Sequence, residues 1–265
     1  MVMGQAILPP RLIDWRKDRN MKKKHNYRLL VSSVAIVFLT AVLFIKFSLI
    51  MQSTYEATDE AREYILNPAD GVTVEETEKT IVFTPENPDT AFIFYPGALV
   101  EPEAYAPLME QLAENGIQTI VIKMPHYLAL LDANGARGIQ EQYPKISNWY
   151  IGGHSLGGAM ASMYGAIHNA EYKGLVFLAA YATSDISNTD LNVMLVRGDQ
   201  DHVLNMERYE ESLVYLPKNY EEVVIDGGCH AFFGDYGPQD GDGTPTITVQ
   251  EQTEETLEKL VDFME

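Results

Sequence analysis

The chain has 265 residues, 46% of them hydrophobic and 22% charged, which is enough for one good-sized α/β domain and an appendage. Its formal net charge of −19 is uneven, because residues 1–30 hold eight Lys or Arg against two Asp, a net of +6 that leaves −25 on the remainder. Such an acidic body would repel phosphates, so the composition argues against a nucleic-acid partner.

The first segment, residues 1–28, is basic and is predicted to form a cytoplasmic N-terminus. Its Met21 is followed by three lysines, a pattern typical of the start of an export signal. Met21 is therefore a second candidate for the start of translation, besides Met1.

Residues 29–51 form the most apolar stretch of the chain. About 20 helical residues cross the hydrocarbon core of a bilayer, so the stretch is long enough to be a transmembrane signal anchor. Positive charge precedes the stretch and acidic residues follow it, which predicts an extracytoplasmic C-terminal domain. A cleaved signal peptide, which would release a secreted protein, is the alternative.

After a polar connector at residues 52–71, residues 72–265 are predicted to form a single catalytic domain. Short apolar runs typical of strands alternate with segments of helical spacing, a pattern that favours an α/β fold with a doubly wound, mostly parallel sheet. The strands are expected at residues 72–74, 80–83, 91–95, 117–124, 148–151, 174–179, 192–196 and 221–225. The helices are expected at residues 103–114, after residue 158, at 207–216 and at 250–264. Functional side chains in such sheets follow the carboxyl ends of the strands.

The strand at residues 148–151 leads into Gly-Gly-His-Ser-Leu-Gly-Gly at residues 152–158, and a run of small residues follows. Strand, tight turn and helix with Gly-x-Ser-x-Gly at the turn is the pattern of a nucleophile elbow. It predicts Ser155 as a nucleophile, with Gly153 and Gly157 at places where a side chain would collide with the neighbouring strand and helix. A Gly-rich loop without chemistry is the alternative.

A serine hydroxyl needs a base, and His230 is the best placed of the six histidines, because it follows a strand and a double-glycine turn. Asp201, on the loop after the strand at 192–196, is the preferred partner of that base, with Asp199 as the alternative. The order Ser155, Asp201, His230 is that of hydrolases with a nucleophile elbow.

An oxyanion formed at Ser155 would need two hydrogen-bond donors. The backbone N–H of Leu156, directly after the serine, is one candidate. The N–H of Ala98, on the loop after the strand at 91–95, is the other, since Gly97 lets the backbone approach closely.

Together with these motifs, the segment YPGALVEPEAY at residues 95–105, Gly-Asp-Gln-Asp at 198–201 and the segment at 230–237 resemble the α/β-hydrolase superfamily. The group most similar is that of small bacterial, membrane-anchored, dienelactone-hydrolase-like proteins. The resemblance covers residues 72–265 and implies the α/β-hydrolase fold and a serine triad, without a substrate. Pro96 departs from the group, where many members carry His before the glycine.

The expected function is therefore that of a serine hydrolase that cleaves a small or acyl ester or thioester through an acyl-enzyme. Four residues near the predicted site are candidates for an acyl pocket: Tyr95, Leu99, His126 and Tyr127. The alternatives are a surface binding or scaffold protein that keeps the fold, and a cofactor-free haloperoxidase that uses the same triad.

No pattern in the sequence indicates a cofactor or metal. Asp235, Asp240 and Asp242 lie in a Gly-rich stretch, but their spacing does not fit an EF-hand, so a local structural network is expected. The one cysteine, Cys229, is expected to be a small residue in a tight turn. The sequence does not indicate an oligomeric state.

Overall fold

The computed structural model describes residues 32–33, 36–42 and 54–265. The chain divides into two units, Met1–Gln52 and Ser53–Glu265. In the first unit the described residues are helical, and nowhere in the described ranges is a helix both long and apolar enough to cross a bilayer. Most of the predicted span at 29–51, and the whole predicted cytoplasmic segment 1–28, lie outside the described residues.

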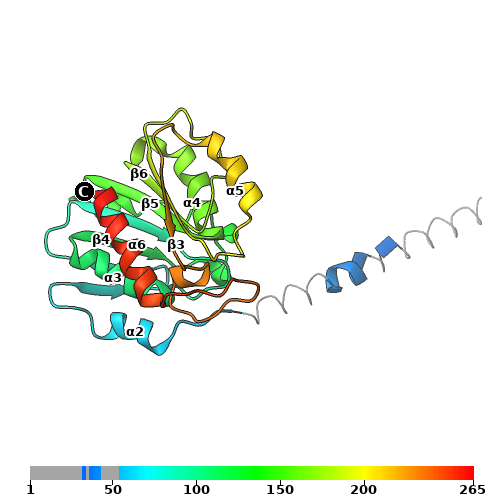
Figure 1. Cartoon of the computed structure of the whole chain (residues 1–265), viewed down its shortest axis with the longest axis horizontal. Helices are drawn as coiled ribbons and strands as arrows, with labels where there is room; N and C mark the ends of the chain where they lie inside the picture. Colours follow the sequence, from blue (N-terminus) through cyan, green and yellow to red (C-terminus); the bar gives the residue numbers. More distant parts are fainter. Residues whose placement is uncertain (1–31, 34–35, 43–53) are drawn as a thin grey trace, which may run out of the picture. The chain divides into compact units, whose positions relative to one another are not determined.

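The second unit is built on an eight-stranded sheet in the order β1-β2-β4-β3-β5-β6-β7-β8 (Figure 1). The strands are β1 Thr73–Glu76, β2 Thr80–Thr84, β3 Thr90–Tyr95, β4 Ile117–Ile122, β5 Asn148–His154, β6 Gly174–Leu178, β7 Asn192–Gly198 and β8 Glu221–Ile225. Strands β3 to β8 run parallel, whereas β1 and β2 form an antiparallel hairpin at one edge. The predicted mostly parallel sheet is confirmed.

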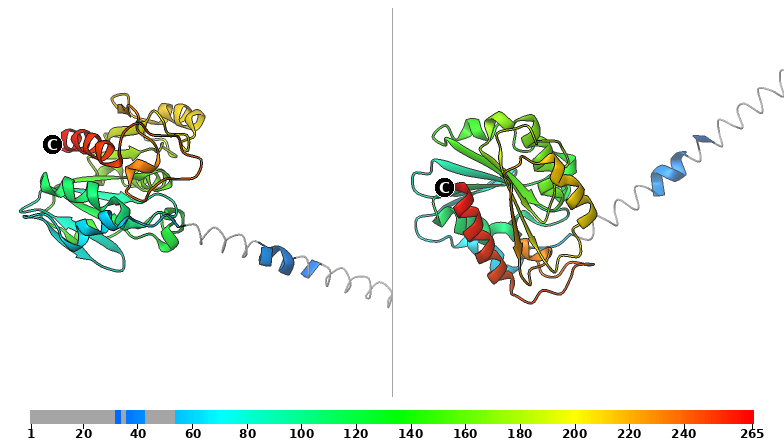
Figure 2. Two further views of the ribbon diagram at one scale, coloured as in Figure 1. Left: turned by 60° about the horizontal axis from the view of Figure 1, so that its bottom comes forward. Right: turned by 45° about the horizontal axis from the view of Figure 1, so that its top comes forward.

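Helices cover both faces of this sheet (Figures 1 and 2). They are α2 Asp59–Leu66, α3 Ala106–Glu114, α4 Leu156–Ile167, α5 Met206–Ser212 and α6 Val249–Met264. Apolar side chains of α3 and α6 belong to one core, and those of α4 and α5 to the core on the opposite face. The doubly wound arrangement is therefore confirmed.

Two predicted helices are interrupted in the structure. Residues 103–114 form a 3₁₀ turn, Pro102–Tyr105, before α3 begins at Ala106. Pro107 lies in the first turn of α3. Backbone N–H groups in a first turn have no intrahelical acceptor, so the proline breaks no hydrogen bond of the helix. Residues 207–216 likewise pass from α5 into a 3₁₀ turn at Leu213–Tyr215.

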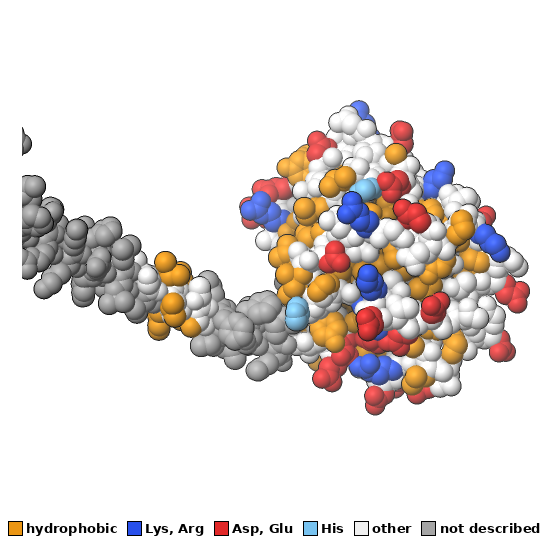
Figure 3. Space-filling model, turned by 180° about the vertical axis from the view of Figure 1, so that it is seen from behind, with side chains coloured by type: hydrophobic (Ala, Val, Ile, Leu, Met, Phe, Trp, Pro, Cys, Tyr) orange, Lys and Arg blue, Asp and Glu red, His pale blue; other side chains and the backbone are white. Residues whose placement is uncertain are grey.

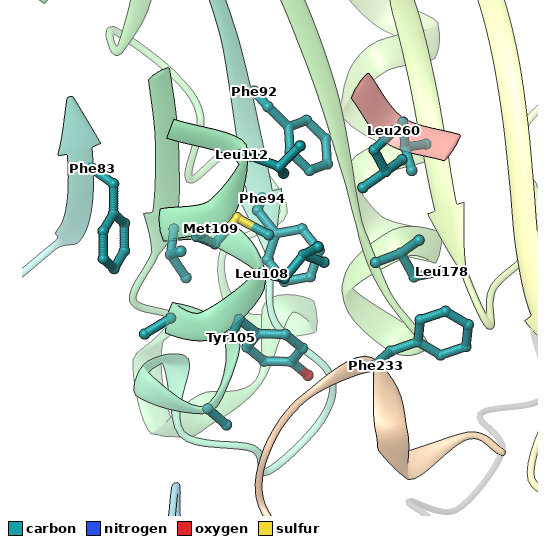
Figure 4. Close-up of a cluster of buried hydrophobic side chains, with 14 of the residues drawn as sticks. Phe83, Phe92, Phe94, Tyr105, Leu108, Met109, Leu112, Leu178, Phe233 and Leu260 are labelled. Atoms are coloured by element: carbon teal, nitrogen blue, oxygen red, sulfur yellow. The ribbon is translucent and has the colours of Figure 1, made fainter. Parts of the chain in front are cut away.

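Strand β3 shows why the central strands are apolar on both faces. All six of its residues are buried. Because successive side chains of a strand point to opposite faces, Phe92 and Phe94 enter the core under α3 and α6, while Ile93 and Tyr95 enter the other core. Figure 4 shows the two phenylalanines one above the other, edge to face, beside side chains of α3 and Leu260 of α6.

The surface mixes both signs of charge, despite the acidic balance of the chain. On the face shown in Figure 3, basic side chains stand singly among acidic and apolar ones.

Residues 54–71, which the sequence assigns to a connector, pack as part of the domain. The Tyr55 N–H donates to the Leu99 carbonyl at 2.7 Å, and the Glu101 N–H donates back to the Tyr55 carbonyl at 3.0 Å. Ala61 of α2 is fully buried in the core under α3. The compact unit therefore begins at Ser53, before the predicted domain start at residue 72.

If α2 is part of the domain core, Ala61→Arg will destabilise the protein by about 2–4 kcal/mol, because it buries a long charged side chain without a partner. Thermal or urea unfolding of the full chain measures the effect. Leu66→Arg is the matched control, since Leu66 lies on the same helix with 70% of its surface exposed. Equal stability of the two variants would contradict the packing of α2.

Candidate active site

The turn between β5 and α4 holds Ser155 in a strained conformation, with φ 51° and ψ −124°. Such a backbone costs about 1–3 kcal/mol in a residue with a side chain and persists only where the surroundings hold it. Here the Ser155 N–H donates to the Leu178 carbonyl at 2.9 Å, and the Ser155 carbonyl accepts from the Ala159 N–H at 3.1 Å. The strain is thus held by β6 on one side and by the first turn of α4 on the other.

The start of α4 lies directly against the end of β3. A Cβ atom on Gly157 would lie 2.1 Å from the Tyr95 carbonyl oxygen and 2.3 Å from that of Pro96. Only glycine permits this approach, which brings the turn after Ser155 beside the loop that carries Ala98.

The loops after β7 and β8 bring Asp201 to His230. His230 Nδ1 lies 2.8 Å from Asp201 Oδ2, and both side chains are almost fully buried. The other carboxylate oxygen, Oδ1, accepts from the N–H groups of Val203 and Leu204 at 2.9 and 2.8 Å. An acceptor held in this way keeps the imidazole proton on Nδ1 and leaves Nε2 as the basic atom.

Asp199, the alternative partner of His230, instead forms a hydrogen bond with the backbone. Its Oδ1 accepts from the Gly227 N–H at 2.8 Å and so holds the turn that precedes His230. The geometry therefore pairs His230 with Asp201.

Ser155 and His230 line the same cavity, whose volume is about 220 Å³. The rest of the lining is mostly small and apolar: Leu156, Ala159, Ala179, Ala180, Tyr181, Val203, Leu204 and Asn205. His230 Nε2 is buried and has no hydrogen-bond partner among the described residues, Ser155 included. Hydrogen bonds between a nucleophile and its base are often long before substrate binds.

The predicted acyl-pocket residues Tyr95, Leu99, His126 and Tyr127 do not line this cavity. The Tyr95 side chain is fully buried, and its hydroxyl donates to the Ala133 carbonyl at 3.1 Å. The other three follow β3 and β4, where the Leu99 N–H donates to the Tyr127 carbonyl at 2.8 Å. The cavity instead lies against the loops after β6 and β7, on the other side of the elbow, so the acyl-pocket role of these four residues stays a prediction that this cavity does not support.

The two predicted oxyanion donors have no backbone acceptor in the described part of the chain. Leu156 is the first residue of α4, so its N–H has no intrahelical partner. The N–H of Ala98 donates to no backbone carbonyl, in contrast to the N–H groups of Leu99 and Val100. Both donors are therefore open to an incoming oxygen.

Left-handed backbone in residues other than glycine gathers at the carboxyl ends of four neighbouring strands. Five of the six such residues in the described chain lie there, namely Leu99 after β3, His126 and Tyr127 after β4, Ser155 after β5 and Ala179 after β6, whereas Asn87 precedes β3. Strain of this kind clusters at functional sites, so its position points independently to this edge of the sheet.

Two polar side chains that the sequence did not single out hold the His230 loop. Asp242 accepts from the Ala231 N–H at 2.8 Å, and the Gln252 amide bonds both the N–H and the carbonyl of Cys229 at 2.9 Å. Burial acts to raise the pKa of Asp242, but hydrogen bonds from backbone N–H groups, that of Ala231 first, hold it below its usual value. Asp242 thus belongs to a local network. Across the described ranges, no cluster of three or more His, Cys, Asp or Glu side chains could hold a metal ion.

Cys229 precedes His230, is buried, and has a pKa raised to about 12 by burial. At pH 8 a thiol with that pKa is ionised to roughly one part in 10⁴. We therefore expect iodoacetamide to leave Cys229 unmodified in the folded protein and to alkylate it after denaturation, as read by intact mass. Fast alkylation of the folded protein would contradict the inert role.

Comparison with known proteins identifies the family to which this fold belongs. The alpha/beta hydrolase family model matches residues 91–254. Among solved structures, Est1E from Butyrivibrio proteoclasticus is similar at TM-score 0.53 and 17% identity over 73% of this chain and 98% of that one. Carboxyl esterase 2 from the fungus Tuber melanosporum is similar at TM-score 0.58 and 11% identity, over 80% of this chain and 92% of its own.

Esterase 2 from Thermogutta terrifontis, solved after phosphorylation by paraoxon, is similar at TM-score 0.51 and 16% identity, over 73% of this chain and 95% of its own. A search of curated proteins found no match. The family match spans more than half of the chain, and the observed sheet, elbow and strand-end loops agree with it. The chain therefore belongs to the alpha/beta hydrolase family.

Proposed function

We propose that the protein is a serine hydrolase that cleaves a small ester or thioester through an acyl-enzyme. One observation carries the proposal: Ser155 and His230 line a single cavity while Asp201 lies 2.8 Å from the Nδ1 atom of His230. Nucleophile, base and orienting carboxylate are the three groups that acyl transfer requires.

In the proposed mechanism, Ser155 Oγ attacks the substrate carbonyl while His230 Nε2 takes its proton. The Asp201 carboxylate orients the imidazole and stabilises the imidazolium that forms. The N–H groups of Leu156 and Ala98 donate to the oxyanion of the tetrahedral intermediate. His230 then gives its proton to the leaving group, and a water molecule, activated by the same histidine, releases the acyl group from Ser155.

The lining of the cavity favours a short, uncharged acyl group. Alanine, leucine and valine side chains dominate the cavity, and no Lys, Arg, Asp or Glu lines it. Two of the similar structures are esterases, which motivates an ester as the first substrate to test.

We expect the full chain to hydrolyse p-nitrophenyl esters, with higher kcat/KM for acyl groups of two to four carbons than for eight or more. Ser155→Ala removes the nucleophile and should lower kcat by about 10⁴-fold or more. Ser162→Ala is the matched control: Ser162 lies on the same helix, its hydroxyl donates to the Ala159 carbonyl at 2.7 Å, and its loss should leave turnover unchanged.

A fluorophosphonate probe distinguishes the remaining outcomes. Labelling at Ser155 without ester turnover would mean that the triad acts on another substrate, and product analysis with halide and peroxide would then test the haloperoxidase alternative. A folded protein that is neither labelled nor active would favour the binding protein and overturn the proposal.

We also propose that residues 29–51 anchor the protein in the cell membrane with the hydrolase domain on the extracytoplasmic side, a proposal supported by the apolar run and by the charges on either side of it. The full chain should stay in the membrane pellet after alkaline carbonate washing, and a protease added outside intact spheroplasts should digest the domain. A variant without residues 29–51 is the control for pelleting. Release of the full chain by carbonate, or a mature N-terminus found by sequencing within or after residues 29–51, would overturn the anchor.

A further inference from the structure

Beneath the loop that carries Ala98 lies a buried polar pair, Tyr105 and His154. The Tyr105 hydroxyl lies 2.8 Å from His154 Nδ1 and accepts from the Gly97 N–H at 2.9 Å. Tyr105 comes from the 3₁₀ turn before α3, and its ring packs on Phe94 at 4.8 Å between centroids. Figure 4 shows the ring below Phe94, with the hydroxyl on the side of Phe233. The Tyr105 hydroxyl thus joins the loop at Gly97, eight residues before it, to His154, which is 49 residues farther along the chain.

The direction of these hydrogen bonds follows from the inventory of donors. A phenol has one proton, and because the Gly97 N–H already donates to the Tyr105 oxygen, that proton is directed to His154 Nδ1. Burial raises the pKa of Tyr105, so it keeps the proton. Burial, and then the charge of His230, hold the pKa of His154 well below its usual value, so its ring is neutral with the proton on Nε2.

His154 also lies against the proposed base. Its ring centroid is 4.6 Å from that of His230 and 5.8 Å from that of Phe233. In the part of the chain that the structure describes, neither Nε2 atom has a hydrogen bond of good geometry, although the backbone of His230 acts on the His154 ring as a hydrogen-bond partner. His154 is therefore in contact with both the ring and the backbone of His230.

Gly97 is adapted to this pair. A Cβ atom at position 97 would lie 2.8 Å from His154 Nδ1 and 3.0 Å from the Tyr105 oxygen. The loop can therefore rest on the two side chains only with glycine at this position. The contact fixes the peptide that precedes the N–H of Ala98.

We propose that Tyr105 and His154 are positioning residues, which hold the Gly97–Ala98 peptide so that the Ala98 N–H faces the oxyanion. The inference rests on the proposed serine hydrolase function and adds the device that places its second oxyanion donor. It assigns a role to the residue before the nucleophile, and to the tyrosine that ends the segment at 95–105. Neither side chain lines the cavity, so neither touches the acyl group of a bound substrate.

The test compares Tyr105→Phe, His154→Phe and His154→Asn in the full chain. The two phenylalanine variants remove the hydroxyl and its acceptor, whereas the Asn amide oxygen can replace Nδ1 as acceptor. Tyr209→Phe is the matched control, because it removes a buried tyrosine hydroxyl that donates to Glu222 at 2.9 Å, outside the pair.

Removing an oxyanion donor costs about 10²–10³ in rate, so displacing one should lower kcat by roughly 10–100-fold in Tyr105→Phe and His154→Phe. KM should change by less than about threefold, because a donor of this kind acts mainly in the transition state. A trifluoromethyl ketone, which forms a tetrahedral adduct with the serine, should lose affinity in step with kcat/KM. His154→Asn should recover most of the rate, and the double variant Tyr105→Phe/His154→Phe should be no slower than either single variant.

The inference would be overturned if folded Tyr105→Phe and His154→Phe variants kept kcat within twofold. It would also be overturned if only KM rose, or only the melting temperature fell, while kcat stayed unchanged. If Tyr105→Phe fails to fold, the comparison of His154→Phe with His154→Asn decides, and equal rates for those two would be the negative result. Wild-type protein that neither turns over esters nor takes the fluorophosphonate would overturn the proposed function, and this inference with it. Active wild type with unaffected variants would overturn this inference alone.

Discussion

The contact between the end of β3 and the start of α4 is the constraint on which the candidate site depends. The Tyr95 and Pro96 carbonyl oxygens occupy the space that a side chain at position 157 would need, so only a glycine there lets the helix begin against the strand. This contact brings the turn at Ser155, whose φ is 51°, beside the loop at Gly97 and Ala98. The two predicted oxyanion donors therefore lie on either side of this contact, with the N–H of Leu156 at the start of α4 and the N–H of Ala98 on the loop after β3.

The other half of the site is held by polar groups that are buried and almost completely paired. Asp201 accepts two backbone N–H groups as well as the imidazole, and Asp242 and Gln252 hold the chain on either side of His230. In surroundings of low dielectric constant, such networks are rigid when every member is paired, and they hold a base in one orientation. Within the described residues, the Nε2 atom of His230 is buried and has no hydrogen-bond partner, as the proposed role of a base requires.

The N-terminal part of the domain takes part in the same arrangement. The backbone of Tyr55 pairs with both sides of the loop at 99–101, and Glu101 forms an ion pair with Arg62 of α2. The segment that enters the domain from the chain's apolar stretch is therefore bonded to the loop that follows the predicted second oxyanion donor.

The sequence by itself determined the features that depend on local pattern. Fully apolar strands predict a parallel sheet covered on both faces, because a strand buried on both sides has no polar face to show. The glycines around Ser155 predict an elbow, and the chain order predicts Asp201 and His230 as a set, although their chemical roles stay predictions. Only tertiary structure decided which aspartate reaches His230, that the cavity lies beyond Leu156 rather than beside Tyr95, and that Tyr105 meets His154. Those outcomes depend on which distant segments pack against one another, and the local pattern of residues along the chain does not determine that.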